Sequence, residues 1–252
     1  MHEGEMRRQP AYMQPPYANR ATRGTPNYTP SRLNQMVALA DRRGWQILIH
    51  AIGDAGIRMA LDAYDSAAAA NPAPSRGRRH RIEHIEAVSA EDIPRFGRMG
   101  VIASMQPMHA SPNQNVLEVW SGNIGPERAS RAWAWKSIKN AGGRLAFGTD
   151  WPVVGLDPRP GIHSALTRQT AAGHPAVGFV PAQRLPLATV IETYTAGSAY
   201  AEFEDAKKGM LRPGMLADIV IWDADIFALP VDKVKHAVVT TTIFDGRVVY
   251  ER

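Results

Sequence analysis

The sequence contains no cysteine among its 252 residues. This excludes disulfide bonds and thiolate metal sites, so any bound metal ion has to be held by His and carboxylate side chains. Such a ligand set suits Zn, Mn or Fe. The chain also has no run of eighteen or more apolar residues, the length that a membrane span requires, and its first twenty residues have no apolar core of the kind found in a secretory signal. We therefore expect a cytoplasmic protein without a membrane partner.

Charge of one sign is not strongly concentrated in the chain. The formal net charge is +5 and the calculated pI is about 9.6. The densest basic run, Arg76, Arg78, Arg79 and Arg81, precedes an apolar segment and is most simply a solvated loop. A nucleic-acid partner would require basic residues clustered on one surface together with a recognition motif. No such motif is present, so we expect no nucleic acid among the partners.

The middle of the chain repeats one pattern four times: a short apolar run followed by a helical segment. Strands that alternate with helices indicate βα units and a parallel sheet, so the expected class is α/β. We expect a first helix over Leu33–Arg43. The four apolar runs are Trp45–His50, His80–Ile85, Val101–Gln106 and Leu145–Asp150. A helix is expected after each run. The first should end near Ala70, and the other three should cover Glu91–Met99, Glu127–Asn140 and Gly161–Thr170.

Both ends of the chain differ from this middle part. Residues 1–30 are rich in Pro, Arg, Asn and Tyr without periodicity, which indicates an irregular leader. A further helix is expected over Leu187–Phe203. The last fifty residues contain apolar runs separated by Pro-Gly and Asp-Gly turns, which indicate antiparallel strands. The predicted organisation is a leader over 1–30, a βα part over 31–203 and a small β-structure over 204–252.

The length of the chain limits the architecture. A closed eight-unit (β/α) barrel takes about 250 residues by itself, and the leader and tail leave room here for only four units. Four parallel strands cannot close a barrel, so the chain is either half of one or a small open sheet. Half a barrel leaves unpaired strand edges and uncovered apolar surface. On that reading we expect the isolated chain to form homo-oligomers, to aggregate or to be loosely packed.

Polar residues follow the predicted strands at their carboxyl ends. His50 ends the first strand, His84 lies near the end of the second, and Asp150 ends the fourth. Gln106 ends the third strand, with His109 three residues later. In an α/β barrel these ends converge on the active site, where two imidazoles and a carboxylate can hold a divalent cation. The alternative for each His is a hydrogen-bonded structural residue, and for Asp150 a turn-capping role.

Five segments carry a resemblance to a known family. RRGWQILIHAIGD, HRIEHIE, SMQPMHA and AFGTDWPV resemble the amidohydrolase superfamily, in particular amidohydrolase family 3, and KGMLRPGMLADIVIWDAD is similar to the closing β-sandwich segment of many such enzymes. The resemblance implies a partial (β/α)₈ TIM-type barrel, containing strands five to eight, plus the C-terminal portion of a β-sandwich. It further implies that His50, His84 and Asp150 are metal ligands, with Asp150 also the catalytic proton carrier.

The same resemblance implies lesser roles for four other residues. His109, Gln106, Asp54 and Glu83 are expected to contact the substrate or to support the ligands, although Asp54 fits a helix start equally well. The implied activity is metal-dependent hydrolysis of carbon–nitrogen (non-peptide) bonds in small amides or formamides, with Zn favoured over Mn or Fe. The alternatives are a non-catalytic half-barrel remnant and a member of the superfamily that acts on an ester or lactone.

The sequence departs from the family pattern in two respects. No His-x-His occurs anywhere, and no lysine precedes Lys136, whereas the family places a His-x-His pair on its first barrel strand and often a modified lysine on its fourth. Part of the expected ligand set is therefore absent. We expect the isolated chain to be weakly active or inactive as a hydrolase.

Overall fold

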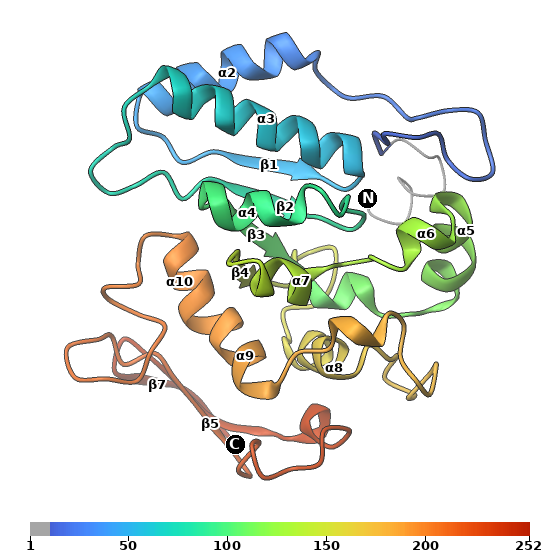
Figure 1. The fold of residues 1–252 in the computed structure, drawn as a ribbon. Helices are drawn as coiled ribbons and strands as arrows, with labels where there is room; N and C mark the ends of the chain where they lie inside the picture. Colours follow the sequence, from blue (N-terminus) through green and yellow to red (C-terminus); the bar gives the residue numbers. More distant parts are fainter. Residues whose placement is uncertain (1–10) are drawn as a thin grey trace. The chain divides into compact units, whose positions relative to one another are not determined.

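The structure is a computed structural model that describes residues 11–252. The first ten residues of the predicted leader lie outside the described part. The chain divides into two compact units, one formed by Met1–Met105 with Pro112–Leu145, the other by Gln106–Ser111 with Ala146–Arg252. Figure 1 shows the elements of both along the chain.

The first unit is built on a parallel sheet, as the sequence predicts. Strands β1 (Leu48–Ala51), β2 (Arg81–His84) and β3 (Ile102–Met105) run parallel, with His50 opposite Glu83 and Ile82 opposite Ala103. The sheet order is β1-β2-β3-β4, and the division between the units falls inside β4 (Arg144–Phe147). The α/β class is thereby confirmed. All four strands lie within or overlap the predicted apolar runs.

Two long helices pack against each other beside β1 (Figure 1). Helix α2 (Pro30–Arg42) is capped at its N-terminus by Thr29, whose hydroxyl accepts a hydrogen bond from the backbone N–H of Arg32. Helix α3 (Asp54–Ala70) buries Ile57, Leu61 and Tyr64, which recur at the spacing of one helical face. The Tyr64 hydroxyl reaches the Ile47 carbonyl at 3.1 Å, so it connects the helix to the strand region. Helix α4 (Ile93–Met99) follows β2.

The described part of the leader is irregular in backbone but fixed by packing. Met13 and Tyr17 are buried, and the N–H of Gln14 donates to Oδ1 of Asp54 at 2.7 Å. A Cβ at Gly53 would overlap the Tyr12 carbonyl oxygen, so this close approach of two backbones requires glycine. Part of the described leader, including Met13 and Tyr17, therefore belongs to the first unit's core.

The predicted helix over Glu127–Asn140 is wrong. The region forms short helices instead: a wide π-type turn over Asn115–Trp120, then α5 (Ser121–Ile124), α6 (Pro126–Ala129) and α7 (Trp135–Asn140). Between α6 and α7, Trp133 has a left-handed backbone (φ 47°) and its N–H donates to the Glu86 carbonyl at 2.8 Å. This contact with the segment after β2 replaces the helical hydrogen bonds that local sequence favours.

Helices and a separate sheet make up the second unit. A 3₁₀ turn, η1 (Pro107–Ala110), packs against α8 (Arg159–Thr167). The predicted Leu187–Phe203 helix is present as three consecutive pieces: α9 (Leu187–Glu192), a π-type turn over Thr193–Gly197 and α10 (Ser198–Ala201). Short 3₁₀ turns lie at Pro181–Gln183 and Val234–His236.

The tail forms the predicted antiparallel strands. Strands β5 (Ile219–Trp222), β6 (Val239–Phe244) and β7 (Arg247–Glu251) form a sheet in the order β5-β6-β7, with an Asp245-Gly246 turn between the last two. Several large apolar side chains on this sheet are exposed: Val220, Ile221, Phe244, Val248, Val249 and Tyr250. The predicted division at residue 204 stays a prediction. No helix among the described residues has the length and apolar character needed to cross a membrane.

Candidate functional site

Two of the predicted metal ligands meet in the first unit. The imidazole rings of His50 and His84 lie edge to face, with centroids 4.4 Å apart and planes at 67°. They come from neighbouring parallel strands, and each stands in the last two residues of its strand. His84 is buried, at 6% exposure, while His50 is exposed. Strands β1 and β2 pair in parallel, with His50 opposite Glu83 and Ala51 opposite His84, which brings the two imidazoles to the same end of the sheet.

The backbone at two candidate ligands is strained. His84 has a φ of 76° and Asp150 a φ of 64°, both in the left-handed region that residues with a Cβ rarely occupy. At His84 this conformation ends strand β2 and redirects the chain into Ile85, whose φ is 51°. Such strained positions cluster at functional sites, where surrounding packing has to hold them in place.

The second unit brings together another pair. Nε2 of His109, in η1, lies 3.9 Å from Oδ2 of Asp150, which follows β4. The His109 side chain is 4% exposed, whereas that of Asp150 is one-third exposed, at 33%. The pair places a partly exposed carboxylate beside a buried imidazole, at a separation longer than a hydrogen bond.

Three further predicted residues have contacts of their own. Gln106 is buried and its carbonyl accepts the N–H of His109 at 3.0 Å, so it helps to shape η1. Glu83 forms an ion pair with Arg81, with 2.8 Å between Oε1 and Nε. Asp54 opens α3 and accepts hydrogen bonds from the N–H groups of Gln14 and Ala55. Burial raises the pKa of Asp54, although those hydrogen bonds oppose the shift. These contacts support the helix-start alternative for Asp54.

The sequence analysis assigned no role to Glu86, two residues after His84. Its carboxylate is buried, at 2% exposure, and Oε2 accepts a 2.8 Å hydrogen bond from Nε1 of Trp120. The Trp120 ring stacks on Trp133 with centroids 4.6 Å apart. Glu86 therefore acts as a positioning residue for the segment that follows His84. The acidic residue at the end of the motif HRIEHIE was the one sequence signal for this role. The sequence did not indicate its partner, because Trp120 is 34 positions away.

A close helix approach supports η1 in the second unit. A Cβ at Gly161, in α8, would overlap the hydroxyl of Tyr194 and would lie 3.8 Å from the backbone nitrogen of Met108. Tyr194 in turn meets the ring of Phe147 edge to face, with centroids 5.5 Å apart. Burial raises the pKa of Tyr194, so its hydroxyl stays protonated. Gly161 thus allows α8 to pack against the turn that carries His109.

The donor set fits a divalent metal ion. Imidazole nitrogen and carboxylate oxygen are the ligands that Zn, Mn and Fe accept in hydrolytic centres. The first unit supplies two such imidazoles in ring contact, and the second supplies a carboxylate with an adjacent imidazole. The residues present therefore match the chemistry that the sequence predicts.

Comparison with known proteins identifies relatives of the chain. The model of a family described as "Amidohydrolase family" matches residues 2–250. The chain is 36% identical to protein LONG AFTER FAR-RED 3 of Arabidopsis thaliana over 77% of this chain and 33% of that protein. It is 28% identical to a protein named "Putative amidohydrolase YtcJ" of Bacillus subtilis (strain 168) over 99% of this chain and 46% of that protein. An N-substituted formamide deformylase of Arthrobacter pascens is 24% identical over 89% and 40%, respectively.

Solved structures give the same result. An uncharacterized metal-dependent hydrolase from Pyrococcus horikoshii OT3 superposes with a TM-score of 0.76 at 25% identity, over 90% of this chain and 44% of that one. A second, from Pyrococcus furiosus, gives 0.68 at 26% identity over 83% and 40%. The chain thus spans less than half the length of each of these relatives.

Proposed function

Because the chain belongs to the amidohydrolase family, we propose that it carries part of the metal centre of a hydrolase that cleaves carbon–nitrogen bonds in small amides or formamides. The observation that carries this proposal is the contact between His50 and His84, whose rings lie 4.4 Å apart at the ends of neighbouring strands. In this proposal His50, His84 and Asp150 are metal ligands. The formamide class is supported by the Arthrobacter relative, whose name states that activity.

The proposal also covers the architecture of the two sheets. Four strands, of which the first three are parallel, with helices between them, would be half of a (β/α)₈ barrel, strands five to eight. The β5–β7 sheet, with its exposed apolar side chains, would be the C-terminal portion of a β-sandwich.

Each residue has a definite task in hydrolysis. When bound, a divalent ion supplies Lewis acidity and a water nucleophile at neutral pH. The carboxylate of Asp150 accepts a proton from the attacking water and returns it to the departing amine nitrogen, because it is both accessible and adjacent to an ionisable imidazole. His109 lies beside that carboxylate, with 3.9 Å between Nε2 and Oδ2. Gln106 supports His109 through the backbone of η1.

The number of metal ligands in this chain should limit its hydrolase activity. Catalytic zinc sites keep three protein ligands and an open position, and the His-x-His pair of the family is absent from this sequence. We propose weak metal binding and little or no turnover by the chain alone, with Zn favoured over Mn or Fe.

Metal binding and hydrolysis test the proposal. Equilibrium dialysis against Zn²⁺ should show binding that His84→Ala and His50→Ala each weaken at least tenfold, since each removes one ligand. The matched control is His236→Ala, which alters an exposed histidine outside the two pairs. An N-substituted formamide and a simple acyl amide serve as substrates. Equal zinc binding by all four proteins would contradict the ligand assignment. Rapid turnover that survives His84→Ala would contradict the mechanism.

A further inference from the structure

We propose that a polar hollow in the first unit binds a small organic carboxylate through the side chains of Arg128, Arg131 and Gln14. The hollow has a volume of about 470 Å³ and is lined by residues of the leader, of the segment after β2 and of α5 and α6. All of its lining residues belong to the first unit, and none of them is a proposed metal ligand. The proposal therefore does not depend on the proposed hydrolase activity.

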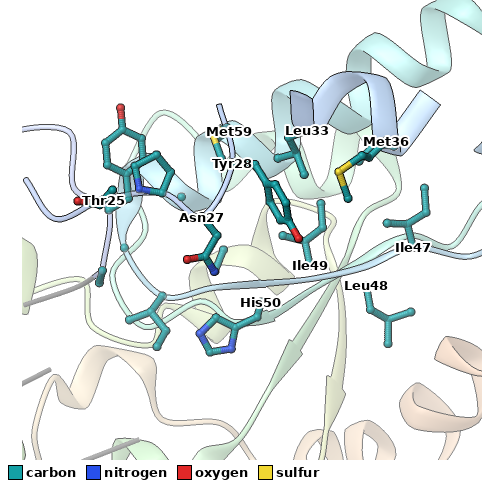
Figure 2. Close-up of a pocket in the computed structure, with 18 of the residues that line it drawn as sticks. Thr25, Asn27, Tyr28, Leu33, Met36, Ile47, Leu48, Ile49, His50 and Met59 are labelled. Carbon is teal, nitrogen blue, oxygen red and sulfur yellow. The ribbon is translucent and has the colours of Figure 1, made fainter. Parts of the chain in front are cut away.

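This polar hollow differs in chemistry from a larger hollow beside β1 (Figure 2). The larger one has a volume of about 530 Å³, and Leu33, Met36 and Ile49 give it an apolar wall. None of the described residues that line it is Lys or Arg. A carboxylate placed there would lose water without gaining a charged donor, which is unfavourable. The polar hollow is lined by two arginines, so an anion fits it better.

The guanidinium of Arg128 is held in place by neutral groups. Its Nε donates to the carbonyl of Ile124 at 2.7 Å, and its terminal nitrogens donate to the carbonyls of Pro15 and Pro16 at 3.1 and 2.8 Å. Within residues 11–252 it forms no ion pair with a carboxylate. A guanidinium has five N–H donors, so two remain for a ligand. Arg128 is therefore a fixed cation at the hollow without a direct anionic partner.

Two further donors at the hollow have no acceptor. Nε2 of Gln14 and Nε of Arg131 are buried, and neither donates a hydrogen bond within residues 11–252. Buried nitrogen donors in folded proteins are nearly always paired with protein, water or a ligand. Because both residues line the same hollow, a ligand with oxygen acceptors can supply the missing partners there. A carboxylate offers two such oxygens together with a negative charge for the arginines.

Glu127 occupies the edge of Arg131 that the ligand would use. Its Oε1 accepts a hydrogen bond from Nη2 of Arg131 at 3.2 Å, while the Glu127 side chain is 86% exposed. An exposed ion pair of this kind contributes little stability, so the Glu127 side chain can rotate into solvent. Nη2 and Nε of Arg131 can then bind the two oxygens of a ligand carboxylate side by side. Glu127 is thus a competitor of the ligand within the site.

The acidic residues of the lining favour a ligand with a single negative charge. Glu91 forms an ion pair with Arg58 at 2.7 Å, and Asp54 accepts two backbone N–H groups. Together with Glu127 they place three carboxylates around the hollow. A dianion, such as inorganic phosphate above its second pKa, would meet more repulsion there than a monoanion. The site therefore fits a monocarboxylate.

Calorimetric titration of the metal-free 252-residue chain with benzoate tests the proposal. Benzamide has nearly the same shape without the charge, and inorganic phosphate is the dianion probe. We expect saturable benzoate binding, with both other probes bound about tenfold more weakly, because the first loses charged hydrogen bonds and the second adds repulsion. Arg131→Gln should weaken benzoate binding about tenfold. The matched control is Arg32→Gln, at an exposed arginine of α2, which should change it less than twofold.

Glu127→Gln separates ligand binding from a purely structural role of the arginine. Loss of the competing charge should tighten benzoate binding about threefold or more, whereas loss of a structural ion pair would only lower stability. Weaker binding in Glu127→Gln overturns the proposal, as does binding that Arg131→Gln retains. Benzoate binding that His84→Ala abolishes would assign the ligand to the proposed metal site and also overturns it.

A second measurement needs no variant. In the parent chain, nitrogen-15 NMR should show benzoate shifting the side-chain amide resonance of Gln14 and the Nε resonance of Arg131, with the midpoint found by calorimetry. These are the two nitrogens without an acceptor. Resonances that both stay unchanged at saturating benzoate overturn the proposal. Absence of saturable benzoate binding overturns it as well, and assigns the two buried donors to water.

Discussion

Asp150 holds its carboxylate 3.9 Å from Nε2 of His109 while its own backbone is left-handed, with a φ of 64°. The strained backbone and the reactive side chain belong to the same residue. Strain of this kind costs about 1–3 kcal/mol and is typically retained where the side chain is needed for function.

Substitutions at Asp150 should therefore separate stability from function. Asp150→Ala should be less stable than Asp150→Gly by about 1 kcal/mol, because glycine adopts a positive φ without a Cβ clash. Asp150→Asn should fold like the parent, since Asn tolerates this region, yet should weaken zinc binding. Urea unfolding of the three variants measures this. Alanine and glycine variants of equal stability would show that the backbone at this position is unstrained.

The hydrogen bond between Trp120 and Glu86 should contribute measurably to the first unit. Trp120→Phe keeps an aromatic ring against Trp133 but removes the N–H that donates to the buried carboxylate at 2.8 Å. A hydrogen bond to a charged group contributes about 1.5–3 kcal/mol, so unfolding free energy should fall by that amount. Trp45→Phe, at an exposed tryptophan, is the control and should change it little. Equal losses in both variants would contradict the assignment.

The stability of the chain should fall as the pH drops below about 6.5, the ordinary pKa of histidine. Burial lowers the pKa of His80, and hydrogen bonding to Asp41 only partly opposes this; Arg78 and the Tyr64 ring also face it. The unfolded chain then binds a proton that the folded chain does not, so stability rises with pH across this window. His80→Gln should make the fall between pH 7 and pH 5 smaller. If the loss of stability is the same in His80→Gln, other groups cause it. His163 is one such group, because burial lowers its pKa as well.

A further loss should begin at lower pH. Burial alone would raise the pKa of Asp41, but hydrogen bonds from Arg78, Asn71 and His80 outweigh it and leave the pKa below its ordinary value. Its stabilising contribution is therefore present above pH of about 4 and disappears as the pH falls through the lowered value. Asp41→Asn should remove that part of the acid transition.

The contact between Gly161 and Tyr194 should behave as a coupled pair. Gly161→Ala places a Cβ where the Tyr194 hydroxyl lies, and overpacking of this kind costs about 1–3 kcal/mol. Tyr194→Phe removes the hydroxyl, so the double variant should recover part of the loss. A double-mutant cycle by thermal unfolding reports the coupling. Additive effects would show that α8 moves freely away from Tyr194.

The sequence predicted those parts of the molecule whose pattern is local. Four apolar runs with residues such as Ile49 and Ile82 at their centres are strands in the structure, and His50 and His84 stand at their ends. The break at Trp133 was not predictable, because its hydrogen-bonding partner, Glu86, lies 47 positions earlier and overrides local helix preference. The anchoring role of Asp54 likewise depends on Gln14, 40 residues away.

The packing of residues 12–17 against the first unit has a practical consequence. A shortened version of the chain designed from the first helix would begin at Pro30, and it would lose Met13 and Tyr17, both almost fully enclosed. Asp54 would then lose its hydrogen bond from Gln14, and Gly53 would lose its contact with the backbone of Tyr12. Anyone trimming this polypeptide for crystallisation should therefore cut ahead of Tyr12, even though the segment that follows has no regular secondary structure.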